Sequence, residues 1–229
     1  MIVYTMTTAE MVVEARKDFR ALYNRCEKPL RDARREMIRQ KQQIIHLMDW
    51  TSPRKNHWLL LVHQRKSGPR IYALVWYYDR EGRINAMHLA HKGMAFRIDR
   101  HVIERYGERF DPTAKPLERL QRFWLENHVY GLEPTKQLPD GRWSVNVGMN
   151  HGMGLGLWEQ GTEIVLVDTF INHGQMFSNQ LDTMDRMDLQ RMMTDMTVGQ
   201  RRFFIDLIKR RHPESIGSPG LTWLEQLAA

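Results

Sequence analysis

The segment HWLLLVHQRKSGPRIYALVWYYDREGRINAMHLA, residues 57–90, decides the fold class. It contains three runs rich in apolar, β-branched and aromatic residues, at 57–65, 70–79 and 83–90. The short turns KSGP and REG separate these runs. Strand-like runs joined by tight turns predict a meander of three antiparallel strands.

A second set of strand-like runs lies further along the chain, at 142–149, 154–160 and 162–171. The turns NHGM and QGT join them, and glycine in such turns allows a positive φ. The two sets predict an α+β fold, in which one or more antiparallel sheets from two three-stranded meanders pack against helices.

Helices are expected before, between and after the two meanders. Residues 8–48 carry acidic side chains early and basic side chains late, which suits a helix dipole, and Pro29 is expected to interrupt them. Residues 99–110 and 117–130 show apolar spacing typical of helices, and so does the tail 178–211.

These segments suggest three consecutive parts within one domain. Residues 1–50 are expected to form an N-terminal helical segment, residues 51–180 an α+β core, and residues 181–229 a C-terminal helical segment. A chain of 229 residues is long enough to bury a substantial core in this way.

Composition and charge narrow the class of protein. Hydrophobic residues make up 42% and charged residues 27%, which is typical of a globular protein, and no apolar run is long enough to span a membrane. Cys26 is the single cysteine, so an intrachain disulfide is impossible, and we expect a cytoplasmic protein. The formal net charge of +7 favours a polyanionic partner such as nucleic acid.

The helix expected after the first meander, RHVIERYGERF, carries three basic side chains at four-residue intervals: His101, Arg105 and Arg109. Asp99 is a suitable N-cap for it. On a helical wheel the three basic residues run along the border between an apolar arc and a charged face, a position that can line a cleft. Pairing with Glu104 and Glu108 is the structural alternative, but the like charges at i,i+4 offset that gain.

The last strand of the second meander, LVDTFINHG, brings a second group of polar residues. Strict alternation places Thr169 on the same face as Val165 and Val167, so its hydroxyl can point toward an adjacent helix. His173 follows in the turn. The alternative is that Thr169 is present for its β-propensity alone.

Other chemistries find little support in the chain. His88 and His91 are three residues apart, a spacing that puts them on opposite faces of a strand, and there is no HExxH motif. We therefore expect neither a metal nor a cofactor. The glycines of GMGLG lie inside a meander, so they do not form a dinucleotide-binding loop.

A set of His, Arg and hydroxyl groups suffices for RNA cleavage. A base removes the proton of the 2′-hydroxyl, cations stabilise the charge on phosphorus, and an acid protonates the leaving oxygen. This chemistry needs no metal ion.

The helix RHVIERYGERF, a short second helix and a meander ending VLVDTFINHGQMFSNQ resemble small phage and mobile-element proteins that look like distant members of the barnase–EndoU–colicin–RelE (BECR) nuclease superfamily. The resemblance covers residues 97–180. It implies helices packed on an antiparallel sheet and metal-independent RNA cleavage. It also implies that His101 and Arg105 match the helical catalytic pair, that Thr169 matches the strand hydroxyl, and that Arg109 is auxiliary.

The leading prediction is thus a metal-independent ribonuclease with His101, Arg105 and Thr169 as catalytic residues. Arg109, Arg100 and His173 are expected to bind the substrate, which is RNA rather than DNA. A protein inhibitor or a second copy of the chain is a possible further partner. The alternative is a non-catalytic nucleic-acid-binding or partner-binding protein of a phage or mobile element, with the N-terminal arginine face as a contact.

Overall fold

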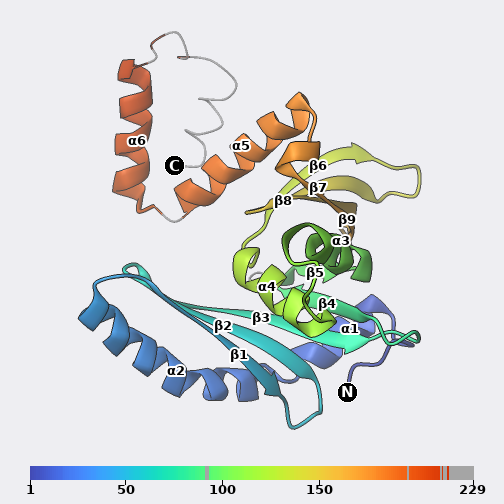
Figure 1. Ribbon diagram of the computed structural model, residues 1–229. Helices are drawn as coiled ribbons and strands as arrows, with labels where there is room; N and C mark the ends of the chain where they lie inside the picture. The colour runs from blue at the N-terminus through green and yellow to red at the C-terminus, as the bar shows by residue number, and fades with distance from the viewer. Residues whose placement is uncertain (91–92, 195, 212, 214–215, 217–229) are drawn as a thin grey trace. The chain divides into compact units, whose positions relative to one another are not determined.

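The computed structural model describes residues 1–90, 93–194, 196–211, 213 and 216 of the chain. The chain forms two compact units, residues 1–175 and residues 176–229. The first unit contains all the described strands, and the second contains the helices α5 and α6 (Figure 1).

One mixed sheet forms the framework of the first unit, with the strand order β1-β2-β3-β4-β5-β9-β8-β7-β6. Its strands are β1 (Ile44–Thr51), β2 (His57–Arg65), β3 (Gly68–Tyr78), β4 (Ile84–Leu89), β5 (Ala95–Ile98), β6 (Gly131–Gln137), β7 (Trp143–Met149), β8 (Gly152–Glu159) and β9 (Ile164–Asn172). Neighbouring strands are antiparallel except β5 and β9, which are parallel.

The prediction of an α+β fold is confirmed, and the expected strands pair antiparallel as β2–β3–β4 and β7–β8–β9. The sheet is not purely antiparallel, however, and it is larger than two three-stranded meanders. Strands β1 to β5 are consecutive in the sheet, and β9 to β6 continue it in reverse order. The parallel pair β5–β9 joins these two sets, because Ala95 to Ile98 align with Ile164 to Val167. The result is a single mixed sheet of nine strands.

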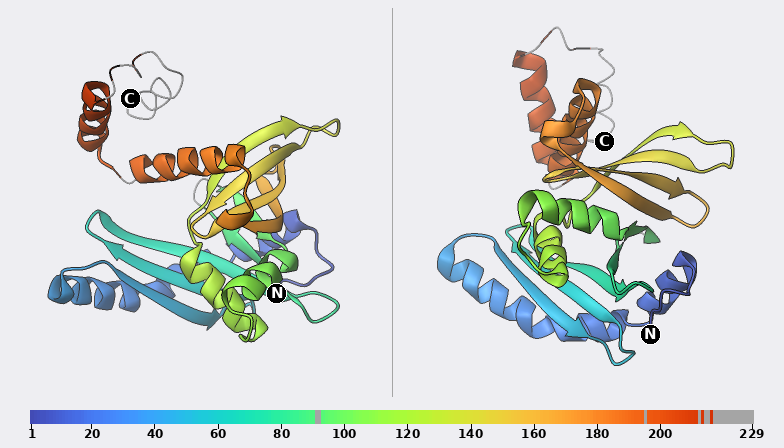
Figure 2. Two further views of the ribbon diagram at one scale, coloured as in Figure 1. Left: turned by 45° about the horizontal axis from the view of Figure 1, so that its top comes forward. Right: turned by 45° about the vertical axis from the view of Figure 1, so that its right-hand side comes forward.

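Helices cover both faces of the sheet around β2 (Figure 2). Successive side chains of a strand point to opposite faces, so Leu59 and Leu61 enter one hydrophobic cluster while Trp58 and Leu60 enter the other. Helices α1 and α2 pack into the cluster of Trp58, and α3 and α4 pack into that of Leu59. The helix bounds are α1 (Thr8–Arg16), α2 (Phe19–Gln40), α3 (Arg100–Phe110) and α4 (Pro116–Glu126).

The prediction of a helical segment over residues 1–50 is wrong in two places. The break between helices falls at Lys17 and Asp18, whereas Pro29 lies inside α2. Residues 44–51 form strand β1, which pairs with β2 along its whole length. The apolar spacing of Ile44, Ile45 and Met48 suits either a helix or a strand, and the ladder with β2 favours the strand.

Two further strands are absent from the sequence prediction. β5 has only four residues, too few for a periodic pattern. β6 lies at the edge of the sheet and contains Pro134, a residue that has no backbone N–H and so rarely occurs in a central strand. The helix predicted over 117–130 ends at Glu126, which leaves the following residues free to form β6.

The second unit contains two helices, α5 (Ser178–Thr194) and α6 (Val198–Arg211), in place of one continuous tail helix. Met193 and Ile205 form its small hydrophobic cluster, with Leu189 packed against them. Residues 217–229 of the expected C-terminal segment lie outside the described residues. No helix among the described residues has the length and apolar character needed to cross a membrane.

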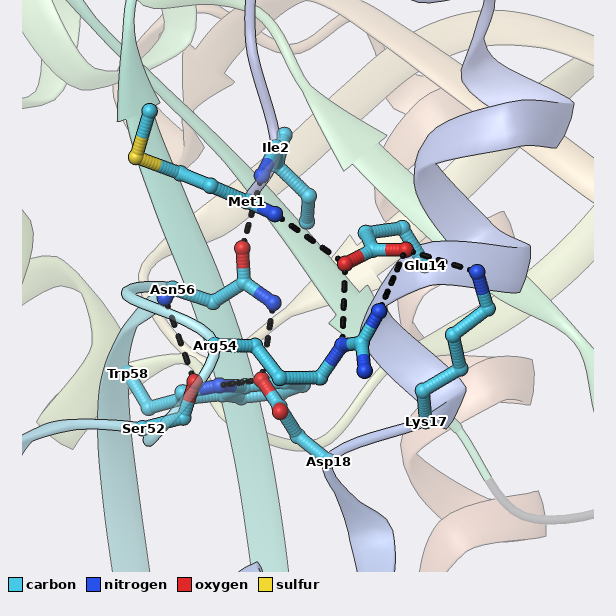
Figure 3. A network of polar contacts seen from close by, with 9 residues as sticks. All are labelled: Met1, Ile2, Glu14, Lys17, Asp18, Ser52, Arg54, Asn56 and Trp58. Atoms are coloured by element: carbon cyan, nitrogen blue, oxygen red, sulfur yellow. Dashed lines mark hydrogen bonds and ion pairs between the residues drawn. The ribbon is translucent and has the colours of Figure 1, made fainter.

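A polar network ties helices α1 and α2 to the loop before β2 (Figure 3). Asp18 is 1% exposed, and its Oδ2 accepts hydrogen bonds from Asn56 Nδ2 at 2.8 Å and Trp58 Nε1 at 3.0 Å. The Glu14 carboxylate binds Lys17 Nζ at 2.8 Å and Arg54 Nε at 3.0 Å. These bonds give the buried polar groups of the loop their partners.

Replacing Glu14 with glutamine is expected to lower the free energy of unfolding by about 1–2 kcal/mol at pH 7, since its cationic partners are half-exposed. Lys17 and then Arg54 lower the pKa of Glu14 from 4.5 to about 2. Because folding lowers this pKa, the stabilisation is complete above pH 4.5 and is lost as the pH falls toward 2. Urea unfolding of both proteins at pH 7 and pH 3 measures the effect.

The difference between wild type and variant should shrink at pH 3. A difference of equal size at both pH values would show that the ion pairs do not stabilise the fold. Glu27, exposed on α2, gives the control variant Glu27→Gln, for which little change is expected at either pH.

Candidate functional site

Helix α3 is positioned by its N-cap and by its apolar face. The Asp99 side chain accepts a hydrogen bond from the His101 amide at 3.0 Å, as the sequence predicted. Val102, Ile103 and Tyr106 are buried and pack against the sheet and α4. The border row of basic residues therefore has a fixed orientation.

The three residues of that row do not share one environment. The side chain of His101 is 55% exposed, and its Nδ1 lies 3.4 Å from Glu104 Oε2. Arg105 is exposed. Arg109 turns toward β9, where its Nη1 donates a hydrogen bond to the Phe170 carbonyl oxygen at 2.9 Å. Of the row, Arg109 is the residue whose side chain contacts the sheet.

Thr169 does not lie on the face that alternation predicts. The β8–β9 ladder shifts register between Leu155 and Gly156, so Asp168 is an extra residue on β9. After this bulge, Phe170 enters the same cluster as the two valines that precede it, and its ring centre lies 5.8 Å from that of Tyr106 on α3. Thr169 therefore points to the opposite face, away from α3. The structure does not bring His101, Arg105 and Thr169 together.

The other two predicted substrate-binding residues lie at separate places. Arg100 forms an ion pair with Asp79, with Nη1 and Oδ2 2.8 Å apart. His173 follows β9 in a short 3₁₀ turn, and its Nε2 donates to the Asn150 carbonyl oxygen at 3.2 Å.

A different group of titratable side chains meets where α3, the end of α4 and the β7–β8 turn come together. The Tyr106 hydroxyl lies 2.9 Å from His151 Nδ1, and His151 Nε2 lies 3.9 Å from Glu126 Oε2. When the proton of the neutral ring is on Nε2, facing the carboxylate, Nδ1 accepts the hydrogen bond that Tyr106 donates. We call the group of Tyr106, Arg122, Glu126, His151 and His173 the tyrosine–histidine corner.

The backbone around His151 is held firmly by the end of α4. The His151 amide donates to Asn127 Oδ1 at 3.0 Å, and Asn150 Nδ2 donates to the Glu126 carbonyl oxygen at 2.6 Å. The ring of Phe110 stacks on that of His151, with centres 5.0 Å apart. The imidazole is therefore oriented while about one third of its side chain is exposed to solvent.

The register of the last two strands brings His173 to the same corner. Gly152 and Asn172 are the terminal pair of the β8–β9 ladder. His151 precedes the first and His173 follows the second, so both histidines lie at the same end of this ladder. The hydrogen bond from His173 Nε2 to the Asn150 carbonyl oxygen, 3.2 Å long, holds His173 beside the turn that carries His151.

Charge and burial set the protonation states at the corner. Burial, and then the charge of Glu126, raise the pKa of Tyr106 to about 12, so its hydroxyl stays protonated near neutral pH. Arg122 Nη1 lies 2.9 Å from Asp111 Oδ2, and this hydrogen bond raises the pKa of Arg122. The corner therefore combines a fixed cation, a hydroxyl donor and two histidines.

The sequence prediction missed His151, Glu126 and the hydroxyl of Tyr106. Tyr106 was assigned to the apolar arc, which is correct for its ring. His151 stands in a Gly-containing turn without a periodic pattern, and its only signal is its place beside Asn150 between two strands.

The core histidine His88 is engaged inside the protein. His88 is buried between β4 and α4, its Nδ1 lies 3.0 Å from the Ala73 carbonyl oxygen, and burial lowers its pKa to about 4. Its expected neighbour His91 lies outside the described residues. Within the described part of the chain, no three His, Cys, Asp or Glu side chains are grouped so that they could hold a metal ion.

No protein-family model, curated protein or solved structure matches the chain. The functional conclusions below therefore rest on the geometry and charge of the chain itself.

Proposed function

We propose that the protein cleaves RNA phosphodiester bonds without a metal ion, at the tyrosine–histidine corner. The observation that carries this proposal is the series Tyr106–His151–Glu126, in which a 2.9 Å hydrogen bond joins the first pair and a 3.9 Å ion-pair contact joins the second. A second histidine, His173, follows the last residue of the β8–β9 ladder at the same end. Two histidines of this kind can remove one proton and supply another in the same reaction.

The roles follow from the hydrogen bonds. His173 donates through Nε2, so its Nδ1 has a lone pair that removes the proton of the ribose 2′-hydroxyl. The 2′-oxygen attacks phosphorus, and the bond from phosphorus to the 5′-oxygen breaks. His151, when protonated, gives its Nε2 proton to that leaving oxygen, while Tyr106 orients the ring through Nδ1. Arg122 supplies a cation for the phosphorane oxygens.

The products identify this reaction. Purified protein in EDTA is expected to convert single-stranded RNA of mixed sequence into fragments with 2′,3′-cyclic phosphate and 5′-hydroxyl ends, and to leave DNA of the same sequence intact. The double variant His151→Gln/His173→Gln, purified in the same way, controls for contaminating nucleases. Cleavage of DNA, equal cleavage by the double variant, or no RNA cleavage would each overturn the proposal.

A non-catalytic RNA-binding protein is the second candidate. One observation favours it: Arg122 is already paired with Asp111, which neutralises part of the charge that a phosphorane needs. Binding of RNA by both wild type and the double variant, with no cleavage by either, would select this candidate.

A further inference from the structure

A groove lies between the C-terminal half of α2 and the β2–β3 hairpin, outside the tyrosine–histidine corner. Its volume is about 410 Å³. The residues that line it are Leu30, Arg31, Arg34 and Met37 of α2, with Gln64, Arg65, Lys66, Gly68 and Pro69 of the hairpin. Figure 1 shows this end of α2 beside the hairpin.

The lining of the groove is strongly cationic. Four of its side chains, Arg31, Arg34, Arg65 and Lys66, carry a positive charge, and the described lining residues include no carboxylate. Like charges held close together repel one another, so the arrangement is most stable with an anion between them.

The acidic residues of α2 next to the groove are engaged with other side chains. Asp32 binds Lys28 at 2.7 Å and lies 3.9 Å from Arg35. Glu36 lies 3.1 Å from His46 Nε2 on β1 and accepts a hydrogen bond from Gln40. Both carboxylates are therefore engaged with residues outside the groove lining, although Asp32, whose pKa is lowered most by Lys28, is also close enough to Arg31 for that charge to lower its pKa further.

A helix dipole does not account for this charge. The dipole stabilises basic residues in the last turn of a helix, where α2 carries Arg39, whereas Arg31 and Arg34 lie further from its end. Arg65 and Lys66 come from a β-hairpin, where no such dipole acts, yet they line the same groove from the other side. A ligand that contacts both elements accounts for both pairs.

We propose that this groove binds the phosphate backbone of a single-stranded nucleic acid. Two pairs of cations on opposite walls suit consecutive phosphates, and the apolar side chains of Leu30, Met37 and Pro69 offer contacts for sugar and base. A concave groove accommodates a strand but not the flat surface of an anionic membrane. The site requires no cleavage activity, so it goes beyond the proposed function.

Charge reversal on one wall tests the site. The variant Arg31→Glu/Arg34→Glu is expected to weaken binding of a fluorescent single-stranded DNA 12-mer at least tenfold, measured by fluorescence anisotropy. DNA excludes any effect of RNA cleavage. The loss of two phosphate contacts should also reduce the slope of log K against log salt by about 1.4.

A matched control lies on the same helix. Arg20→Glu/Arg25→Glu changes the net charge equally, on exposed residues outside the groove, and should retain nearly wild-type affinity. Lys66→Glu, on the opposite wall, should weaken binding like the first pair, and circular dichroism verifies that each variant is folded. Equal losses in both double variants, no binding by wild type, or groove-dependent binding of anionic vesicles without binding of the strand would overturn the proposal.

Discussion

Replacing His151 with alanine is expected to lower the rate constant of RNA cleavage about 10²- to 10⁴-fold, the usual contribution of a positioned acid or base. The expectation follows from the 2.9 Å contact with the Tyr106 hydroxyl and from the partial exposure of the ring. Single-turnover cleavage with excess protein measures the chemical step directly. Anisotropy with a non-cleavable strand should show unchanged binding.

His101→Ala is the matched control for that experiment. His101 lies on the same helix as Tyr106, but its side chain faces solvent beside Glu104. We expect its loss to change the rate less than about twofold. A large loss in His101→Ala with none in His151→Ala would return the acid–base role to the residue that the BECR resemblance implies.

Tyr106 acts through His151 and not on the substrate, so its test is a pH profile. Tyr106→Phe removes the hydroxyl and leaves the packed ring. The rate should fall, and the pH at which the alkaline limb of the profile turns should shift, because that limb reports loss of the proton that His151 donates and Nδ1 of this ring loses its partner. A fall in rate at every pH without such a shift would indicate a structural role only.

Replacing Gly156 with alanine is expected to lower the free energy of unfolding by about 3 kcal/mol or more. Gly156 lies on β8 at the bulge, where an added Cβ would overlap the carbonyl oxygen of Leu166 on β9. That neighbour is backbone, so it cannot move aside without distorting the ladder. Urea unfolding followed by circular dichroism measures the difference.

Gly161→Ala provides the comparison for this second prediction. Gly161 lies in the turn between β8 and β9, where an added Cβ meets no atom within 4 Å. Its effect should stay within about 0.5 kcal/mol. Equal stability of Gly156→Ala and wild type would mean that β8 and β9 do not approach as closely as the bulge requires.

Much of the first unit follows from local pattern, and the exceptions have identifiable causes. The bounds of β2 agree with the sequence prediction because its nine residues lie between clear turns. The sequence pattern predicts helix where β1 forms, because the spacing of Ile44, Ile45 and Met48 suits a helix as well as a strand. Only the pairing with β2 resolves this ambiguity. β5 depends on a partner some 70 residues away along the chain, which no local pattern reveals.

The candidate site was predictable only in part, for similar reasons. Sequence periodicity predicts a border row that includes Arg109 but does not show that this residue alone of the three bonds to β9. The prediction that His173 follows the last strand in a turn agrees with its place after β9. The predicted face of Thr169 is wrong because Asp168 is an extra residue on β9. This residue reverses the alternation of side chains between the two faces of the sheet from that point on. His151 reaches Tyr106 through tertiary structure alone, since the two are 45 residues apart.

The parallel pair β5–β9 also sets the order of events during synthesis. Until residues 164–172 have left the ribosome, β5 has no partner on one side and is an edge strand with unpaired backbone amide and carbonyl groups. Until β9 is available, these unpaired groups can form hydrogen bonds with a strand of a neighbouring polypeptide, which would lead to aggregation. Assembly of the framework is therefore completed late, by the strand that is made last and inserted in the middle.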